Sequence, residues 1–480
     1  MDYKNILKIL SLLGITIGTI FFLDILVGFI YDENYKEFLY VDLTLISINI
    51  ISWALLKKHE LNLKIKESIL VVNLIWILLG IVGATPLYLY TDITFSSAFF
   101  EAVSGFTTTG ATVYNDIESL PKMILFHRSL MHWLGGLGVI VLGVGLLSMI
   151  NPSGSLSLFK AESTGIQLEK LTPRIKDTAI RLWGIYLLLT IIDTSFLKFF
   201  GMDWFDALNH AFSTISTGGF STKNNSMGYF SQDGIIWTTT IFMILSGINF
   251  LAHLKAIHKD FNGYKTEEVF WYIIIGFILS LTLTFIHVDI GGDSFYDAFK
   301  HSSFTIASVI TTTGFATVDY GSWSHLAIAT IFVGMLIGGN AGSTAGGIKV
   351  IRHIIIFKTL FSEFKRILHP NIIISVFIDN IKQPQRVLAS TFGFFALFMI
   401  TTGMVTIYIY ARGYDAMSAI SGAFALVGNV GPGFALVGPS DNFSFFSDID
   451  KIVFSFAMII GRLECYTVFV LLSKSFWEKF

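Results

Sequence analysis

The chain is poor in charge and almost free of cysteine. Charged residues make up 14% of its 480 residues and hydrophobic residues 53%, whereas a soluble domain carries close to a quarter charged residues. A single cysteine, Cys465, excludes a disulfide framework and a cysteine-based metal site, and we interpret it as a helix-packing residue. The formal net charge of -2, without a basic stripe, argues against a nucleic-acid partner. The composition is that of a helical protein in a lipid bilayer, where its 42 glycines permit close helix contacts.

Long apolar stretches are abundant instead. Ten of them approach the ~20 residues that about 30 Å of hydrocarbon requires. They predict membrane spans at residues 6–30, 38–56, 68–90, 127–150, 178–200, 234–254, 269–288, 325–357, 388–411 and 451–473. The first stretch is too long for the apolar core of a signal peptide and lacks a small-residue cleavage pattern, so it reads as a span. We therefore expect an all-α polytopic membrane protein.

Lysine and arginine concentrate in alternate loops. The loops after the second, fourth, sixth and eighth predicted spans are basic, and include Lys57, Lys64, Lys160, Lys170, Arg174, Lys176, Lys259, Lys265, Lys365 and Arg366. The loops between them are richer in aspartate and glutamate. Because basic loops remain on the cytoplasmic side, we expect both termini in the cytoplasm.

Four short segments recur about every hundred residues, on the predicted outer side. They are TTTGA at 107–111, STGG at 216–219, TTTGF at 311–315 and NVGP at 429–432. Each follows a short predicted helix and precedes a long apolar stretch. Two crossings per repeat insert all four copies in the same sense, so a rotation about the membrane normal can relate them.

This pattern predicts how the chain is organised. We expect an N-terminal transmembrane hairpin at 1–60, followed by four pseudo-four-fold repeats around one ion pore. Each repeat consists of a span, a short pore helix, an extended segment and a second span. Their predicted bounds are 61–157, 158–265, 266–370 and 371–480.

A glycine is the residue common to the four segments, at Gly110, Gly218, Gly314 and Gly431. Glycine adopts a left-handed φ that lets successive backbone carbonyls face one ion, and rings of carbonyls select bare cations. One such segment alone would more often be an ordinary helix contact, but four copies in register favour a K+ selectivity filter. The candidate K+ ligands are Thr108, Thr109, Gly110, Ala111, Ser216, Thr217, Gly218, Gly219, Thr312, Thr313, Gly314, Phe315, Asn429, Val430, Gly431 and Pro432.

Three of the preceding short helices contain an aromatic-Asp-Ala triplet. The triplets lie at 205–207, 296–298 and 414–416, and the first repeat has Ser-Ser-Ala at 96–98 instead. We expect these aspartates or serines to cap the helix N-termini. The carbonyl end of each helix would then face the pore and favour a cation.

Glycines interrupt the eighth predicted span. Each interior glycine costs up to about 1 kcal/mol of helix stability relative to alanine, so we expect an intramembrane loop below the filter that obstructs ion flow. The alternative is a small-residue packing face, which does not require the polar residues found there. The candidate gate residues are Gly338, Gly339, Asn340, Gly342, Ser343, Thr344, Gly346, Gly347 and Lys349.

Arg462 lies midway along the last predicted span, where an arginine is costly and usually functional. Glu464 is two positions away and would face elsewhere on a helix. A guanidinium about 7 Å from a permeating cation would repel it by roughly 2 kcal/mol at an effective dielectric constant of about 20, which is enough to gate. The alternative is a staple that binds an acid or the carbonyls of another helix.

The remaining polar residues of the spans give weaker signals. His127, His132 and His210 lack metal-ligand spacing, and we expect them to be interfacial or packing residues. Asp24 lies within the first span, and the sequence indicates no partner for it.

Together these motifs resemble the TrkH/KtrB/HKT superfamily of potassium transport proteins, and the TrkH branch most closely. The resemblance covers nearly the whole chain, and the leading hairpin at 1–60 favours TrkH over KtrB. The motifs that carry it are the four segments, MHWLGGLGVI at 131–140, GSTAGGIKVIR at 342–352, HPN at 369–371, GPG at 431–433 and GRLE at 461–464.

The resemblance implies a homodimer in a prokaryotic inner membrane, with one pore per subunit passing K+ inward and no organic cofactor. It also implies a cytosolic regulatory partner, an RCK-type nucleotide-binding subunit similar to TrkA. The chain has no Walker or Rossmann fingerprint, so nucleotide control would act in trans. The broken helix and mid-membrane arginine of the family correspond to residues 338–347 and Arg462. A glycine in every filter resembles the potassium-selective members, and 429–432 departs most from their pattern.

Two other functions compete with a channel. A symporter coupled to Na+ or H+ is the closer alternative, although no chain of membrane carboxylates stands out in the sequence as a proton relay. A membrane enzyme would need a convergent nucleophile, base or metal set, and the predicted spans contain no such constellation.

Overall fold

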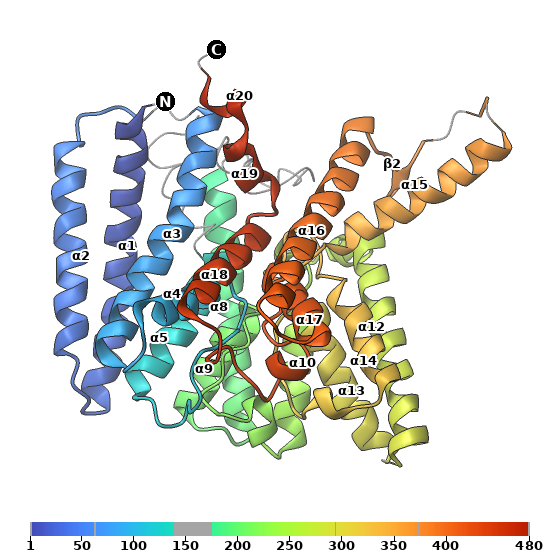
Figure 1. The fold of residues 1–480 in the computed structure, drawn as a ribbon, viewed down its shortest axis with the longest axis horizontal. Helices are drawn as coiled ribbons and strands as arrows, with labels where there is room; N and C mark the ends of the chain where they lie inside the picture. The colour runs from blue at the N-terminus through green and yellow to red at the C-terminus, as the bar shows by residue number, and fades with distance from the viewer. Residues whose placement is uncertain are drawn as a thin grey trace.

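The computed structural model is built almost wholly of helices (Figure 1). It describes residues 2–61, 64–138, 175–292, 294–369, 371–372 and 375–478. The second half of the predicted fourth span and the basic residues Lys160, Lys170 and Arg174 lie outside the described residues. The helices are α1 Tyr3–Ile30, α2 Lys36–Leu55, α3 Ile65–Tyr90, α4 Phe95–Phe106, α5 Lys122–Trp133, α8 Ile175–Phe199, α9 Trp204–Ile215, α10 Asp233–Ser246, α11 Phe250–Ile257, α12 Glu267–Ile286, α13 Phe295–Ile310, α14 His325–Met335, α15 Val350–Leu368, α16 Gln385–Ala411, α17 Ala416–Val427, α18 Asp448–Arg462, α19 Tyr466–Phe469 and α20 Lys474–Trp477.

Six described helices are long and apolar enough to cross a membrane: α1, α2, α3, α8, α12 and α16. The spans predicted at 234–254 and 451–473 each consist of two helices with a sharp bend between them. The pair α10 and α11 bends by 98°, and the pair α18 and α19 bends by 110°. Hydropathy measures how favourably side chains transfer from water to an apolar environment. It contains no information on whether the backbone stays helical, so it could not predict these bends. One short β-hairpin, β1 Phe377–Ile378 with β2 Ile381–Lys382, also departs from the all-α expectation.

The four short helices α4, α9, α13 and α17 connect the molecule into a ring. Each packs on the long helix before it in the chain: α4 on α3, α9 on α8, α13 on α12 and α17 on α16. Each also packs on the helix that follows the neighbouring short helix: α9 on α5, α13 on α10, α17 on α14 and α4 on α18. The last of these contacts joins the end of the chain to its beginning and closes the ring.

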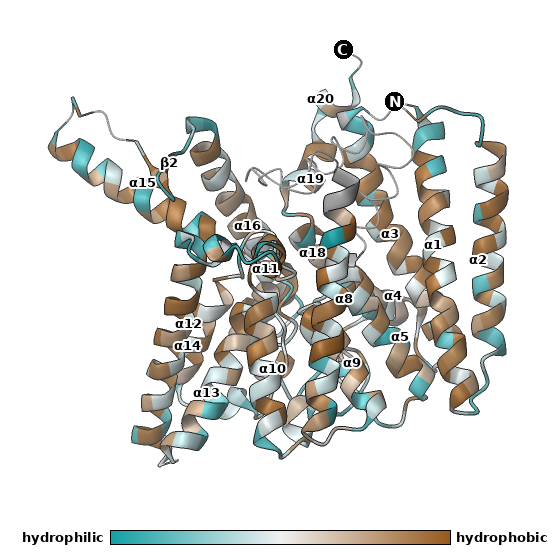
Figure 2. Cartoon of the chain, turned by 180° about the vertical axis from the view of Figure 1, so that it is seen from behind, coloured by the Kyte–Doolittle hydropathy of each residue, from teal (hydrophilic) through white to brown (hydrophobic). Residues whose placement is uncertain are grey.

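The hairpin of α1 and α2 lies at one edge of the molecule, and α15 projects from the opposite side (Figure 1). The two chain ends lie on the same side. Helices α2 and α12 lie at the outside of the molecule and contain many hydrophobic residues (Figure 2), of which Ile48, Ile51, Phe277 and Phe285 are all more than half exposed. Such exposed apolar residues are what a lipid-facing surface requires.

Close packing of α3 on α4 depends on two glycines. A methyl group at Gly80 would collide with Phe99 and Val103, and one at Gly83 would collide with Phe106 and Met131. Glycine at such contacts lets two helix backbones approach closely in a membrane. The first short helix is held in position by this contact.

We expect Gly80→Leu to lower the melting temperature, because the added side chain forces α3 away from α4. Overpacking of this kind typically costs about 1–3 kcal/mol. Gly184→Leu in α8 is the matched control, since no atom lies within 4 Å of a Cβ built at Gly184. Thermal unfolding of both variants in detergent checks this, and equal melting temperatures would contradict the packing argument.

Candidate functional site

All four short helices end with the same backbone geometry. The residue after each C-cap adopts a left-handed φ of 54–56°, at Thr108, Thr217, Thr312 and Asn429. The amide of the following residue returns to the last turn of its own helix, with N–O distances of 2.8–2.9 Å in all four copies. This is a Schellman motif, which normally places glycine or asparagine at the left-handed position.

Threonine at the left-handed position is strained in three of the four copies. A β-branched residue with positive φ is an outlier, and such conformations cost of order 1–3 kcal/mol and cluster at functional sites. Asn429 is the one copy with a residue that tolerates this region well. Three copies therefore retain a costly conformation at the same place.

The positive-φ glycine lies two residues further on, at Gly110, Gly219, Gly314 and Gly431, with φ between 82° and 93°. In the second segment this is Gly219, so the sequence-based register on Gly218 is wrong by one residue. STGG offers two adjacent glycines, and only the helix end decides between them. A Cβ at Gly218 would collide with the ring of His132, which occupies the space of the side chain that Gly218 lacks.

Each of these four glycines lies against a backbone carbonyl of the next segment, and the four contacts form a closed cycle. A methyl group at Gly110 would collide with the carbonyl oxygen of Gly218, and one at Gly219 with that of Thr313. A methyl group at Gly314 would collide with the carbonyl oxygen of Val430, and one at Gly431 with that of Thr109, which closes the cycle. Segments that are about a hundred residues apart in the chain therefore surround a common axis.

In each segment, the backbone carbonyl just before the positive-φ glycine has no hydrogen-bond donor among the described residues. Each amide after the left-handed residue bonds back to its own helix, so the carbonyl of the left-handed residue, which shares that trans peptide, points away from the helix. Among the described residues no hydrogen-bond donor reaches the carbonyl oxygens of Thr109, Gly218, Thr313 and Val430. Buried carbonyls are nearly always paired, so these oxygens are suited to a ligand that accepts their lone pairs.

The helix N-termini are capped, but only Asp415 is a cap that the triplets predicted; in the first helix the cap is Thr94 and not Ser96 or Ser97. The caps are Thr94, Asp203, Ser294 and Asp415. Asp206 and Asp297 instead lie in the first turn, where their backbone amides donate to those caps. A triplet defines the helix start only to within one turn, because Asp is favourable at both positions.

A fully buried ion pair supports the first two segments and was missed by sequence reasoning. Arg128 Nε donates to Glu101 Oε1 at 2.8 Å, and both side chains are at most 1% exposed. The same guanidinium donates to Thr112 Oγ1 and to the Ser221 carbonyl, just beyond the two segments. Arg128 follows His127 in an otherwise apolar stretch, and that intramembrane charge was the available signal.

The interrupted eighth span forms a loop pressed against the base of the segments. Between α14 and α15, the amide of Gly346 donates to Thr312 Oγ1 at 2.6 Å. The hydroxyl of Thr344 donates to the carbonyl of Ile215, at the end of α9, at 3.0 Å. Asn340 is fully buried, and neither polar atom of its side chain has a partner among the described residues. The loop thus contacts the segments of two repeats.

Arg462 lies at the bend after α18 and not midway along a straight span. Its guanidinium donates to the carbonyl of Thr344 at 3.0 Å and to those of Gly135 and Gly136 at 2.9 and 3.3 Å. Glu464 pairs with Arg352 of α15. The Lys349 ammonium donates to the Ala345 carbonyl at the end of the loop. The arginine therefore connects the loop to the first repeat through carbonyls.

The chain also breaks after α5, α10 and α18, in addition to the loop between α14 and α15. After α5 the chain distorts at Gly136, where ψ is -110°, and α10 bends at Gly247. The amide of Asn340 donates to the Gly247 carbonyl at 2.8 Å, while Arg462 joins the first, third and fourth breaks. Sequence reasoning found the third break and missed the others, although each contains a glycine.

The three histidines are all buried, and Asp24 has a partner. His132 stacks on Phe220 at 4.0 Å between ring centres, and His210 lies 2.9 Å from the Ser221 hydroxyl. His127 contacts Asp24 across 2.7 Å. His132 and His210 thus support the second segment, whereas His127 faces the hairpin.

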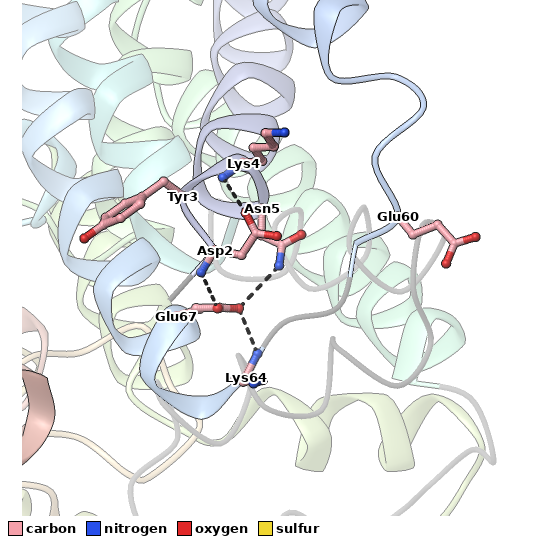
Figure 3. Close-up of a pocket in the computed structure, with 7 residues that line it drawn as sticks. All are labelled: Asp2, Tyr3, Lys4, Asn5, Glu60, Lys64 and Glu67. Carbon is pink, nitrogen blue, oxygen red and sulfur yellow. Dashed lines mark hydrogen bonds between the residues drawn. The ribbon is translucent and has the colours of Figure 1, made fainter. Parts of the chain in front are cut away.

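A hollow of about 610 Å³ lies at the starts of α1 and α3 (Figure 3). The carboxylate of Glu67 accepts from the amides of Asp2 and Lys64 and from the Asn5 side chain. Glu67 therefore holds the start of the chain on α3, and the hollow belongs to the packing of these ends.

Comparison with known proteins agrees with this geometry. A model of the TrkH family, described as cation transport proteins, matches residues 36–273 and 269–479. The chain belongs to the TrkH family. It is 36% identical over 490 residues to the Trk system potassium uptake protein TrkH of Salmonella typhimurium, and 35% identical over 489 residues to that of Vibrio parahaemolyticus, covering all of each protein.

A solved structure is similar over the whole chain. The crystal structure of the potassium transporter TrkH from Vibrio parahaemolyticus superposes with a TM-score of 0.89 and 33% identity, and covers 100% of both chains. Family membership and the apolar helices together make this chain a multi-pass membrane protein. The relatives are named as potassium uptake proteins and transporters, and not as enzymes.

We expect Arg128→Met to destabilise this TrkH-family protein strongly, since it leaves Glu101 charged and buried without its partner. Breaking a buried ion pair costs about 3–5 kcal/mol. Glu363→Gln is the control, because its pair with Arg366 is half-exposed and such pairs contribute about 1 kcal/mol or less. Equal shifts of the unfolding midpoint in the two variants would show that the Arg128 pair does not support the segments.

Proposed function

We propose that this chain takes up K+ through a selectivity filter formed by the four segments. The observation that carries the proposal is the closed cycle of buried carbonyls of Thr109, Gly218, Thr313 and Val430, which lack hydrogen-bond donors among the described residues. Peptide oxygens arranged in rings replace the hydration shell of K+. The names of the relatives support potassium as the ion.

The short helices support the same function electrostatically. Each ends at a filter segment with its carbonyl end, which carries the negative end of the helix dipole. Four such ends around one axis favour a cation over an anion there. The capped N-termini at Thr94, Asp203, Ser294 and Asp415 lie at the other end of each helix.

We further propose that the loop at 338–347 and Arg462 form the gate. The loop is bonded to the filter residue Thr312, and Arg462 holds it to the first repeat. Opening would require these hydrogen bonds to break and the guanidinium to move away from the axis. A positive charge so placed also opposes a cation until that movement occurs.

The remaining parts of the proposal rest on the family resemblance. The protein would work as a homodimer in the inner membrane, regulated by a cytosolic RCK-type nucleotide-binding subunit. The word "system" in the names of the relatives supports more than one component. Both chain ends on one side of the molecule (Figure 1) support a topology with two cytoplasmic termini.

Serine at the four filter glycines tests the proposal. In liposomes with K+ and Na+ gradients, Gly110→Ser, Gly219→Ser, Gly314→Ser and Gly431→Ser should each shift the reversal potential away from the K+ value. The added Cβ collides with the neighbouring carbonyl in every case, which distorts the ring. The carbonyl ring then no longer matches K+.

Gly413→Ser is the matched control. Gly413 also has a positive φ, of 94°, but no atom lies within 4 Å of a Cβ built there. The Gly413→Ser variant should therefore have the same kind of backbone strain as the filter variants but no collision, and its reversal potential should be unchanged. Unaltered selectivity in all four filter variants would remove the basis of the proposal. Uptake that depends on a Na+ or H+ gradient, without channel currents, would favour the symporter instead.

Arg462→Ala should increase K+ flux. Loss of a barrier of about 2 kcal/mol corresponds to a rise of up to about 30-fold. Arg462→Lys keeps the positive charge but not the planar set of hydrogen-bond donors. Low K+ flux in this variant would show that the charge of Arg462, and not its hydrogen bonds, opposes permeation. Arg366→Ala, at an exposed position of α15, is the control. A fall in flux in a folded Arg462→Ala protein would show that Arg462 is a structural staple.

A further inference from the structure

A buried cluster of three titratable side chains lies between the N-terminal hairpin and α5. Asp24 of α1, Asp42 of α2 and His127 of α5 are each 0% exposed. His127 Nδ1 lies 2.7 Å from Asp24 Oδ2. Asp42 lies one helical turn after Phe38, whose ring packs on His127, and so shares that face of α2. Asp24 is six residues before the end of α1, and Asp42 is six residues after the start of α2. The cluster is therefore about 9 Å inside the helix ends.

The hydrogen bonds of His127 require a proton between His127 and Asp24. Its Nε2 lies 3.1 Å from the carbonyl oxygen of Gly83, which can only accept, so Nε2 carries a hydrogen. A neutral imidazole in that tautomer presents a lone pair at Nδ1. The contact with Asp24 therefore needs one more proton, either on Nδ1 or on the carboxyl group.

Asp42 lacks the partners that a buried carboxylate needs. Neither of its oxygens has a hydrogen-bond partner among the described residues, and Asp24 Oδ1 has none there either. A carboxylate in such surroundings is neutralised by a proton instead of remaining charged. The rings of Phe21 and Phe38 lie edge-on to His127, at 4.8 and 5.5 Å between ring centres, so apolar surface encloses the cluster.

Other titratable groups on the same elements have different neighbours. On α3, Gly83 contributes its carbonyl to the cluster. On α5, Arg128 pairs with Glu101, and Lys122 lies over the ring of Tyr31. Glu33 accepts hydrogen bonds from the amides of Lys122 and Met123. Tyr90 of α3 packs on Phe38.

Helix α5 connects this cluster to the filter segments. Arg128, which follows His127, reaches Thr112 and the Ser221 carbonyl at 3.2 and 3.3 Å, just beyond the first two segments. His132, about one turn further along, fills the space beside Gly218. A change of charge at His127 therefore acts on the helix that supports two of the four segments.

We propose that Asp24, Asp42 and His127 form a proton-binding site whose occupancy controls K+ permeation. The proton is the ligand that fits this geometry, because one is held between Asp24 and His127 and a second neutralises Asp42. Control of permeation rests on the proposed potassium function, whereas proton binding does not.

Infrared spectroscopy of the purified full chain in liposomes tests proton binding without K+ transport. We expect a C=O stretching band of protonated carboxyl groups at neutral pH, and Asp42→Asn should remove part of it. Glu37→Gln, at an exposed acid on the same helix, should leave the band unchanged. A band that Asp42→Asn leaves intact, or that responds to Na+ and not to pH, would overturn the proposal.

K+ flux in the same liposomes tests the control of permeation. Wild-type flux should change by about fivefold or more over the pH range in which the band titrates, which is the lower end of usual coupling between sites. Asp42→Asn and His127→Gln should lose this pH dependence while their reversal potentials in K+ and Na+ gradients stay unchanged. Identical pH profiles in the wild type and both variants would overturn the control of permeation by this site.

Discussion

The hydrogen bonding at the ends of the four short helices is the constraint on which the rest of the structure depends. Each helix end uses the amides of its Schellman turn internally, which leaves buried carbonyls without donors. Orphaned carbonyls inside a membrane protein are costly unless they line a wet or ion-filled path. Four such ends meet around one axis, and the close contacts at Gly110, Gly219, Gly314 and Gly431 allow no side chain between neighbouring segments.

The same carbonyl chemistry links the four segments to the loop between α14 and α15. Where the second helices break, freed carbonyls at Gly135, Gly136 and Thr344 accept from Arg462, and the Gly247 carbonyl accepts from Asn340. A broken helix in a membrane must find donors for these groups. One arginine and one glycine-rich loop supply several of them, so movement of the loop would break its hydrogen bonds to Arg462 and to Gly247.

Buried charges divide the surroundings of α5 into two sides. Arg128 and Glu101 hold the filter side, and His127 with Asp24 faces the hairpin. Each pair consists of groups that would be expensive alone in the membrane. The hairpin of α1 and α2 thereby joins α5 through a polar contact as well as through apolar packing.

The sequence alone determined the membrane class, most of the long spans and the places of the four segments, because apolar length and recurring glycines are local properties of the chain. The interruption at 338–347 was readable for the same reason. Only the tertiary structure decided that Gly219 and not Gly218 carries the positive φ, that Glu464 pairs with Arg352, and that α10 and α18 end in bends. These features depend on helix ends and on contacts between residues far apart in the chain, and neither hydropathy nor spacing measures contacts of that kind.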